Sequence, residues 1–320
     1  MLWSCHAQHA AGLRTVRVAI HREPIAFLPL RVAETLGYYQ AEGLAVELSE
    51  TAGGTKAIEA LLGGSVDVAA GSMSDAVQLA AEGHDVRGFL VLYDRPSLAL
   101  AVGPVAHNIR TIRDLRGRTV GVSAPGSASH QFLNFLLVSN GLTPEDVSTV
   151  SVGMSASSIA ALDHGKVDAA ILIASAITLF EDRHPHAQLL ADTRTPAGSR
   201  DAFGSDVFPG VSLLTEDKWL QDNRDTARRF VRAVKKGMRW VREHPAEQVR
   251  NMIPEPARMA DPALDARAIR EIQDGISADG VMPAGSGELI EKFLAVSNPK
   301  VRTAHIDLGH LYTNEFAGEK

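Results

Sequence analysis

Apolar and polar positions along this chain follow two alternating periods. Apolar runs of strand length, such as 15–20 and 66–70, are followed by segments with apolar residues at helical spacing, such as 29–40 and 75–82. The pattern restarts after Pro104. Alternating strands and helices of this kind form mainly parallel sheets with helices on both faces.

The full pattern predicts the following elements. The expected strands are 15–20, 44–50, 66–70, 88–93, 98–103, 118–123, 147–152, 167–173 and 211–215. The expected helices are 29–40, 55–62, 75–82, 111–117, 128–139, 157–163, 216–221, 224–243, 245–252, 262–275 and 286–295. The stretch 194–210, rich in Thr, Pro, Gly, Ser and Asp, predicts a loop.

One unit of sequence occurs twice. Residues 60–70 read ALLGGSVDVAA and residues 161–171 read ALDHGKVDAAI. Each copy indicates the end of an apolar helix, a glycine stop and a buried strand that opens with Val-Asp. The repeat therefore predicts two similar α/β lobes with a cleft between them. Asp67 and Asp168 lie at the strand starts, away from the cleft, so we expect them to bond nearby backbone N–H groups rather than to act as acids or bases.

The length agrees with two lobes, because 320 residues exceed what a single core usually supports. We predict a leader or signal remnant at 1–14, a discontinuous first lobe at 15–103 plus 207–320, and a second lobe at 104–206. Residues 1–14 lack the basic n-region and continuous apolar h-region of a complete signal peptide.

Charge and cysteine content exclude several classes of protein. A net charge of −6 argues against a nucleic-acid surface, and the basic residues of 228–242 alternate with apolar ones as on an amphipathic helix. The single cysteine, Cys5, rules out an internal disulfide or a Cys-based zinc site. No apolar run reaches the ~18 residues of a membrane span. The histidines show no metal-ligand spacing, so we expect no metal.

Candidate binding residues lie in four loops that join strand ends to helix starts: 21–27, 52–55, 71–75 and 123–130. In open α/β sheets the ligand crevice lies outside these strand ends. Helix N-termini carry free N–H donors and a partial positive charge, which favours an anionic ligand group. The hydroxyls expected to assist are those of Thr55, Ser72, Ser74, Ser127 and Ser129. The alternative role at each loop is helix capping, by Thr55, by Ser74 or Asp75, and by Ser127 or Ser129.

The remaining candidates also have structural alternatives. Arg22 either clamps a carboxylate or sulfonate or pairs with Glu23, and Phe27 is either a cleft wall or a core anchor. His130 is a further candidate for ligand contact. Nucleotide and hydrolase motifs are missing, since 123–127 is neither a P-loop nor G-x-G-x-x-G and no G-x-S-x-G occurs.

Three segments together carry a family resemblance. They are LGYYQAEGLAVELSETAGGTKAIEALLGGSVDVA (36–69), IRTIRDLRGRTVGVSAPGSASHQFLNFLLVSNGLTPEDV (109–147) and IAALDHGKVDAAI (159–171). With them the chain resembles the solute-binding proteins of ABC importers in the nitrate/sulfonate/taurine and thiamine-precursor group (SsuA/THI5-like, NMT1), over about 16–254. The resemblance implies a type 2 periplasmic-binding-protein fold, two Rossmann-like lobes and ligand capture by hinge closure.

The resemblance also implies a function and a site. We expect a non-enzymatic periplasmic monomer without a cofactor that binds a small organic anion, a sulfonate, taurine-like compound or aromatic carboxylate, and serves an ABC permease and its ATPase. The implied ligand contacts are Arg22, Glu23, Phe27, Gly53, Gly54, Thr55, Ser72, Met73, Ser74, Ser123, Gly126, Ser127, Ser129, His130, Ala174 and Ser175.

The alternative is a thiamine-pyrimidine-precursor binding protein, or a pyridoxal-phosphate-dependent pyrimidine synthase of the same fold. Lys56, in GGTKAI, lies near the position of the cofactor lysine in that enzyme branch. The Cys-rich motif of those enzymes is absent, because Cys5 is the only cysteine of the sequence.

Overall fold

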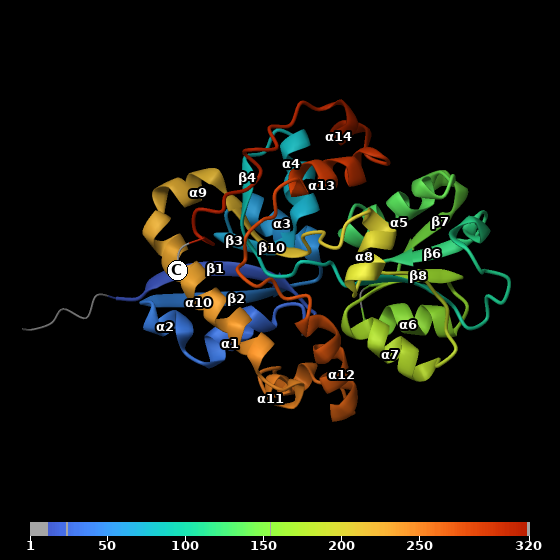
Figure 1. Cartoon of the computed structure of the whole chain (residues 1–320), viewed down its shortest axis with the longest axis horizontal. Coiled ribbons are helices and arrows are strands. Elements are labelled where there is room, and N and C mark those ends of the chain that lie inside the picture. Colours follow the sequence, from blue (N-terminus) through green and yellow to red (C-terminus); the bar gives the residue numbers. More distant parts are fainter. Residues whose placement is uncertain (1–11, 24, 154, 319–320) are drawn as a thin grey trace, which may run out of the picture.

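Two α/β lobes make up the protein, as seen in a computed structural model that describes residues 12–23, 25–153 and 155–318. The first lobe is on the left of Figure 1 and the second on the right. Most of the predicted leader, 1–14, lies outside the described residues. No helix among the described residues is long and apolar enough to cross a bilayer.

The first lobe is built on a five-stranded sheet in the order β2-β1-β3-β10-β4. Its strands are β1 (Arg14–His21), β2 (Leu44–Thr51), β3 (Val68–Ser72), β4 (Val86–Val91) and β10 (Val211–Glu216). Its N-terminal helices are α1 (Leu28–Thr35), α2 (Tyr38–Ala41), α3 (Gly54–Leu62) and α4 (Met73–Ala81). The predicted helix 29–40 is divided into α1 and α2 at Gly37, whose φ of 71° interrupts the helix.

The second lobe has the strand order β7-β6-β8-β5-β9. Its strands are β5 (Leu98–Val102), β6 (Thr119–Val122), β7 (Ser148–Ser151), β8 (Ala169–Ile173) and β9 (Leu189–Asp192). Its helices are α5 (Ala128–Ser139), α6 (Ala156–Asp163), α7 (Ser175–Arg183) and α8 (Pro196–Phe203). Short 3₁₀ turns are found at η1 (Ile112–Leu115) and η2 (Pro144–Asp146).

The C-terminal third is helical, as predicted. It contains α9 (Asp217–Asp222), α10 (Arg224–Glu243), α11 (Ala246–Arg250), η3 (Glu255–Ala257), α12 (Pro262–Gln273), α13 (Ser286–Ala295) and α14 (Pro299–Thr303). The amphipathic α10 buries Phe230, Val234 and Met238 in the core of the first lobe. Helices α12 and α13 lie on opposite sides of the junction between the lobes (Figure 1).

Each sheet contains one antiparallel strand, and that strand follows a crossing between the lobes. Strand β10 runs antiparallel to β3 and β4, and β5 runs antiparallel to β8 and β9. We place the crossings at 92–97 and 204–210. The assignment of 98–103 to the first lobe was wrong, because Leu98–Val102 pairs with Ala169–Ile173 in the second sheet.

The repeated Gly-x-Val-Asp unit performs the same structural task in both lobes. Gly64 and Gly165 have φ of 67° and 62°, a left-handed conformation that ends the preceding helix. Asp67 Oδ2 accepts a hydrogen bond from the backbone N–H of Arg17 at 2.8 Å, and Asp168 Oδ2 accepts one from that of Thr119 at 2.8 Å. The expected backbone-bonding role of both aspartates is confirmed.

Two expectations about the second lobe were wrong. The stretch 194–210 contains α8, which starts at Pro196 and is capped by Thr195, whose hydroxyl accepts a bond from Gly198 N at 3.1 Å. The predicted helix 111–117 is only the 3₁₀ turn η1. No element was predicted between 174 and 193, where α7 and β9 occur.

Candidate ligand-binding site

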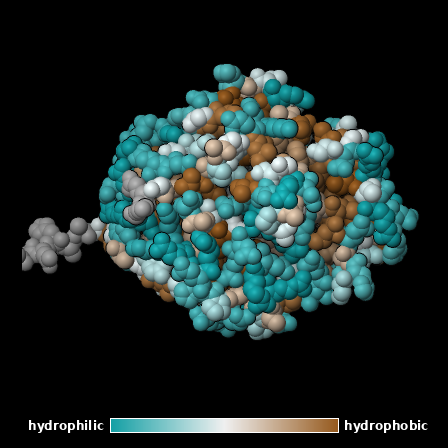
Figure 2. Space-filling view, in the orientation of Figure 1, coloured by the Kyte–Doolittle hydropathy of each residue, from teal (hydrophilic) through white to brown (hydrophobic). Residues whose placement is uncertain are grey.

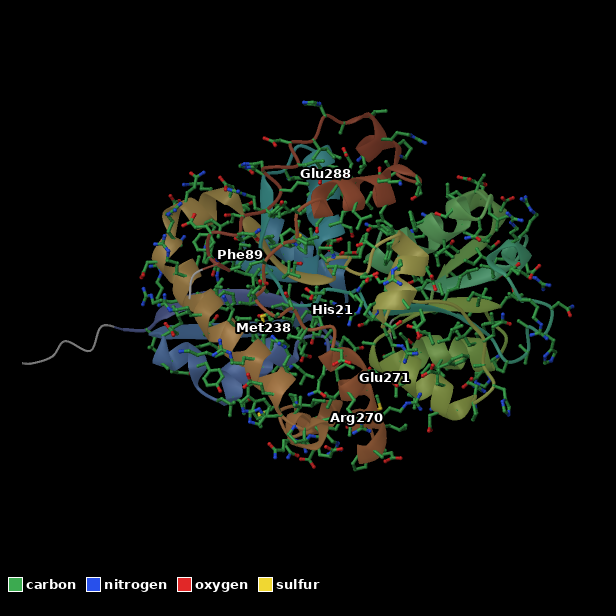
Figure 3. The ribbon with its side chains drawn as sticks, in the orientation of Figure 1. His21, Phe89, Met238, Arg270, Glu271 and Glu288 are labelled. Atoms are coloured by element: carbon green, nitrogen blue, oxygen red, sulfur yellow. The ribbon has the colours of Figure 1, made fainter. Side chains whose placement is uncertain are left out.

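A cavity lies between the two lobes, and its empty space, counted together with the part open to solvent, is about 860 Å³. Both lobes, both crossings and α12 contribute to its wall. The lining residues are His21, Ala26, Gly54, Thr55, Gly71, Ser72, Asp75, Tyr93, Arg95, Pro96, Ser97, Leu98, Ser123, Ser127, Ala128, Ser129, Ile173, Ala174, Gly210, Val211 and Ile272. His21, at the end of β1, marks this junction in Figure 3.

Part of the predicted set lines this cavity. These residues are Gly54, Thr55, Ser72, Ser123, Ser127, Ser129 and Ala174. They come from the ends of strands and the starts of helices in both lobes. All but Ala174, which only the family resemblance implied, belong to the predicted binding loops. Their contact with a ligand remains a prediction.

The other predicted residues are outside the lining. Phe27 is buried in the first-lobe core, with its ring edge-on to His21 at a centroid distance of 4.6 Å. Arg22 is exposed, and its Nε lies 4.0 Å from Glu50 Oε2 rather than beside Glu23. Met73 is also in the core.

Several predicted polar residues bond within the protein instead. Ser74 Oγ, on α4, donates to Gln131 Oε1 on α5 at 2.7 Å and so links the lobes. His130 Nδ1 accepts a bond from Gly126 N at 2.9 Å. Gly53 is the N-cap residue of α3 and is not in the lining.

The three helix N-termini at the cavity differ in their free donors. At α3 the cap residue, Gly53, supplies no side-chain acceptor, so the first N–H groups, those of Gly54 and Thr55, have no partner among the described residues. At α4 a capping box occupies the donors, with Asp75 Oδ2 accepting from Ser72 N at 3.0 Å. An anion is therefore favoured at α3 and opposed at α4 by the Asp75 carboxylate.

At α5 three serine hydroxyls form a triangle. The Oγ atoms of Ser123, Ser127 and Ser129 lie 2.8–3.0 Å from one another. Ser127 Oγ donates to Ala124 O at 2.7 Å, which commits its proton, and it also caps α5. The capping role given above as the alternative is therefore confirmed for Ser127. All three serines of the triangle also line the cavity.

Arg95 is a cavity residue that the sequence analysis missed. It lies on the crossing 92–97 and is only 7% exposed. Its Nε and Nη2 donate to the backbone oxygens of Arg194 and Asp274, at 3.2 and 2.9 Å. Its guanidinium is thus held in place and forms no close ion pair with any described carboxylate, although its charge acts at longer range on Asp94 and Asp206. A buried cation of this kind favours an anionic ligand.

Glu23 lies behind the cavity wall and joins the lobes. Its Oε1 accepts a bond from Ser175 Oγ at 2.9 Å, and Oε2 has no hydrogen-bond partner among the described residues. With 2% of the residue exposed, burial raises the pKa of Glu23 to about 7. Burial also lowers the pKa of the nearby His21 imidazole to about 4, so that this lining residue is neutral at pH 7.

Helix α12 ties the first lobe to the second through ion pairs. Glu271 Oε2 accepts bonds from Thr178 Oγ1 and Arg194 Nη1, both at 2.7 Å, and Arg267 Nη2 donates to Glu181 at 2.7 Å. Glu271 and Arg270 are labelled on α12 in Figure 3, where it approaches the second lobe.

Helix α13 ties the lobes together through aromatic rings on the opposite side of the junction. Phe293 lies 5.0 Å from Phe135 of α5 and 5.7 Å from Phe203 of α8, measured between ring centroids. Figure 2 shows hydrophobic surface over this region of an otherwise mostly hydrophilic face. The contacts of α12 and α13 thus join the two lobes on opposite sides of the junction.

Comparison with solved structures defines the fold. A protein from Bordetella bronchiseptica RB50 is 31% identical, with a TM-score of 0.88 and 95% of each chain covered. The alkanesulfonate-binding protein SsuA from Xanthomonas axonopodis pv. citri, bound to MOPS, is 17% identical, with a TM-score of 0.75 over 95% of this chain and all of that one. The protein therefore has the two-lobed periplasmic-binding-protein fold, as predicted.

Family and sequence comparisons are consistent with this fold. The NMT1/THI5-like family model matches residues 25–248, and the chain belongs to that family. YtlA from Bacillus subtilis (strain 168) is 24% identical over 95% of this chain and 89% of its own length. The 4-amino-5-hydroxymethyl-2-methylpyrimidine phosphate synthase THI13 of Saccharomyces cerevisiae is 24% identical over 69% of this chain and 64% of its own length.

Proposed function

We propose that this protein is the solute-binding component of an ABC importer and that it captures a small organic anion between its lobes. The observation that carries the proposal is Arg95, a buried cation that forms no close ion pair with a carboxylate among the described residues, on the wall of an interlobe cavity. The open N-terminus of α3 adds donors at Gly54 and Thr55. Family membership and the likeness to sulfonate-binding SsuA support the same function.

Capture requires that the ligand contact both lobes. The cavity wall includes Thr55 from the first lobe and Ser127 from the second, with Arg95 on the crossing that joins them. A ligand that touches all three is bound best when the lobes are closed, which shifts the population toward that state. A permease and its ATPase would receive the closed, loaded protein outside the cytoplasm, and we propose that the protein acts as a monomer.

We propose a binding role without catalysis. The synthase alternative requires a lysine that can hold pyridoxal phosphate within the cavity. Lys56 is exposed, its Nζ pairs with Glu59 Oε2 at 2.6 Å, and it is not among the lining residues. Adding pyridoxal phosphate to the protein is therefore expected to give no aldimine absorbance band. A band that appears in the wild type and is lost in Lys56→Ala would favour the synthase alternative.

Isothermal titration tests the proposal. The panel contains alkanesulfonates, aromatic carboxylates, nitrate and a neutral aminopyrimidine, and native mass spectrometry of the purified protein detects any ligand that is already bound. We expect one organic anion to bind with 1:1 stoichiometry. Binding of the pyrimidine with none of the anions would contradict the proposal.

A further inference from the structure

Two residues of opposite charge line the cavity, and they come from different elements. Arg95 lies on the crossing 92–97, and Asp75 lies in the first turn of α4. They do not pair with each other, since no ion pair joins them among the described contacts. Because burial keeps the imidazole of His21 neutral at pH 7, these are the charged side chains of the described lining.

The Asp75 carboxylate retains an acceptor for a ligand. Its Oδ2 accepts the bond from Ser72 N that completes the capping box. Its Oδ1 has no hydrogen-bond partner within the described part of the chain. This atom is also not fully buried, so a ligand can reach it. Burial raises the pKa of Asp75 to about 6, so the group is mostly ionised at neutral pH and accepts hydrogen bonds. A ligand group next to it must donate a hydrogen bond or carry positive charge.

The rest of the wall is largely apolar. Leu98 and Ile173 come from the second lobe, Val211 from β10 and Ile272 from α12. These four side chains have no hydrogen-bonding groups. They therefore favour a ligand with a carbon framework over a bare inorganic ion.

We propose that the cavity selects a dipolar organic ligand, with an anionic group opposite Arg95, a hydrogen-bond donor such as an ammonium opposite Asp75, and a small apolar body between them. This inference rests on the proposed function and narrows its substrate class. Simple anions such as nitrate or alkanesulfonates without a donor group leave Asp75 unpaired. They bind more weakly, because a buried carboxylate without a partner costs free energy.

Matched pairs of compounds test the role of Asp75 by isothermal titration at pH 8, where this carboxylate is ionised. The pairs are taurine with ethanesulfonate, 4-aminobutyrate with butyrate, and 4-(aminomethyl)benzoate with 4-methylbenzoate. In the wild-type protein we expect the amino member of at least one pair to bind about tenfold or more tightly than its counterpart, the usual effect of a charge-assisted hydrogen bond.

The variant Asp75→Asn keeps the amide oxygen that can accept from Ser72 N but removes the charge. Its ratio of affinities within that pair is expected to fall to about twofold or less. Asp114→Asn is the matched control, because Asp114 closes a similar capping box in η1, where its Oδ2 accepts from Thr111 N at 2.8 Å, and it is not in the cavity lining. This control should keep the wild-type ratio.

The results separate this inference from the proposed function. If anions bind but their amino counterparts bind no more tightly, or if Asp75→Asn leaves the ratio unchanged, the dipolar inference is overturned and anion capture stands. If no compound of the pairs and no anion of the wider panel binds, both are overturned.

Discussion

The backbone N–H of Ala174 donates a hydrogen bond to Ser97 O at 3.0 Å, and both residues hold a positive φ, 43° and 46°. L-residues rarely adopt this conformation, which costs on the order of 1–3 kcal/mol. Both residues line the cavity, Ser97 on the crossing and Ala174 at the start of α7. The strained pair therefore fixes the second lobe to the crossing at the binding site.

Replacing Ala174 by glycine should stabilise the protein. Glycine adopts the positive φ without strain, and this gain exceeds the added entropy of the unfolded chain, for a net increase of about 1 kcal/mol in the free energy of unfolding. Urea denaturation measures the change. Ala176→Gly, on the same helix but not at a positive φ, is the control and should destabilise the protein by about 1 kcal/mol. Equal destabilisation by both variants would contradict the strain at Ala174.

The repeated aspartates should affect stability without affecting binding. Asp67→Ala and Asp168→Ala each leave a strand N–H, that of Arg17 or Thr119, without its acceptor. The expected loss is about 1–3 kcal/mol of unfolding free energy. Ligand affinity should stay within about twofold, because neither residue lines the cavity. A loss of binding by a variant that remains folded would show that the repeat belongs to the site.

Glu23 should make stability depend on pH. Burial raises its pKa from 4.5 to about 7 in the folded protein, so the folded state binds the proton more tightly than the unfolded state does. The resulting stability is fully present below pH 4.5 and is lost as the pH rises to about 7, a cost on the order of 3 kcal/mol.

Glu23→Gln removes this titration while keeping an acceptor for Ser175. The melting temperature of this variant should match that of the wild type near pH 4.5 and exceed it above pH 7. Thermal melts across this range measure the difference. A difference that does not change with pH would show that Glu23 ionises in the folded protein as it does in water.

The α12 contact should control the opening of the lobes. Glu271→Ala removes the acceptor for Thr178 and Arg194 of the second lobe. We expect a larger radius of gyration by small-angle scattering without ligand, and a severalfold weaker ligand affinity because the closed state is less populated. Arg270→Ala is the control, since Arg270 on the same helix pairs with Glu247 at 2.9 Å. Identical scattering from Glu271→Ala and the wild type would exclude this role.

Most of the scaffold could be predicted from the sequence because its signals are local. Apolar periods placed the C-terminal helices α9 to α13 within two residues and missed the short α14, and the Gly-x-Val-Asp repeat indicated two matched lobes. The error at 98–103 is of another kind. Its apolar run identifies a strand equally well in either sheet, and only pairing with β8 decides which sheet it joins.

The candidate site could be predicted only in part. Serines at helix starts, such as Ser127, follow from the positions of strands and loops. Arg95 does not, because it lies in a crossing segment without a motif, and its role depends on carbonyl groups of Arg194 and Asp274 that are distant in the sequence. Asp75 was considered only as a helix cap, and its place on the wall of a cavity lined by both lobes is known only from the fold.

A crystal structure with the tightest-binding organic anion of the titration panel tests the central claim most directly. We predict that the anionic group lies between the lobes, about 3 Å from the Arg95 guanidinium and from donors of the α3 N-terminus. A compound bound outside the interlobe cavity, or one whose anionic group points away from Arg95, would contradict this account.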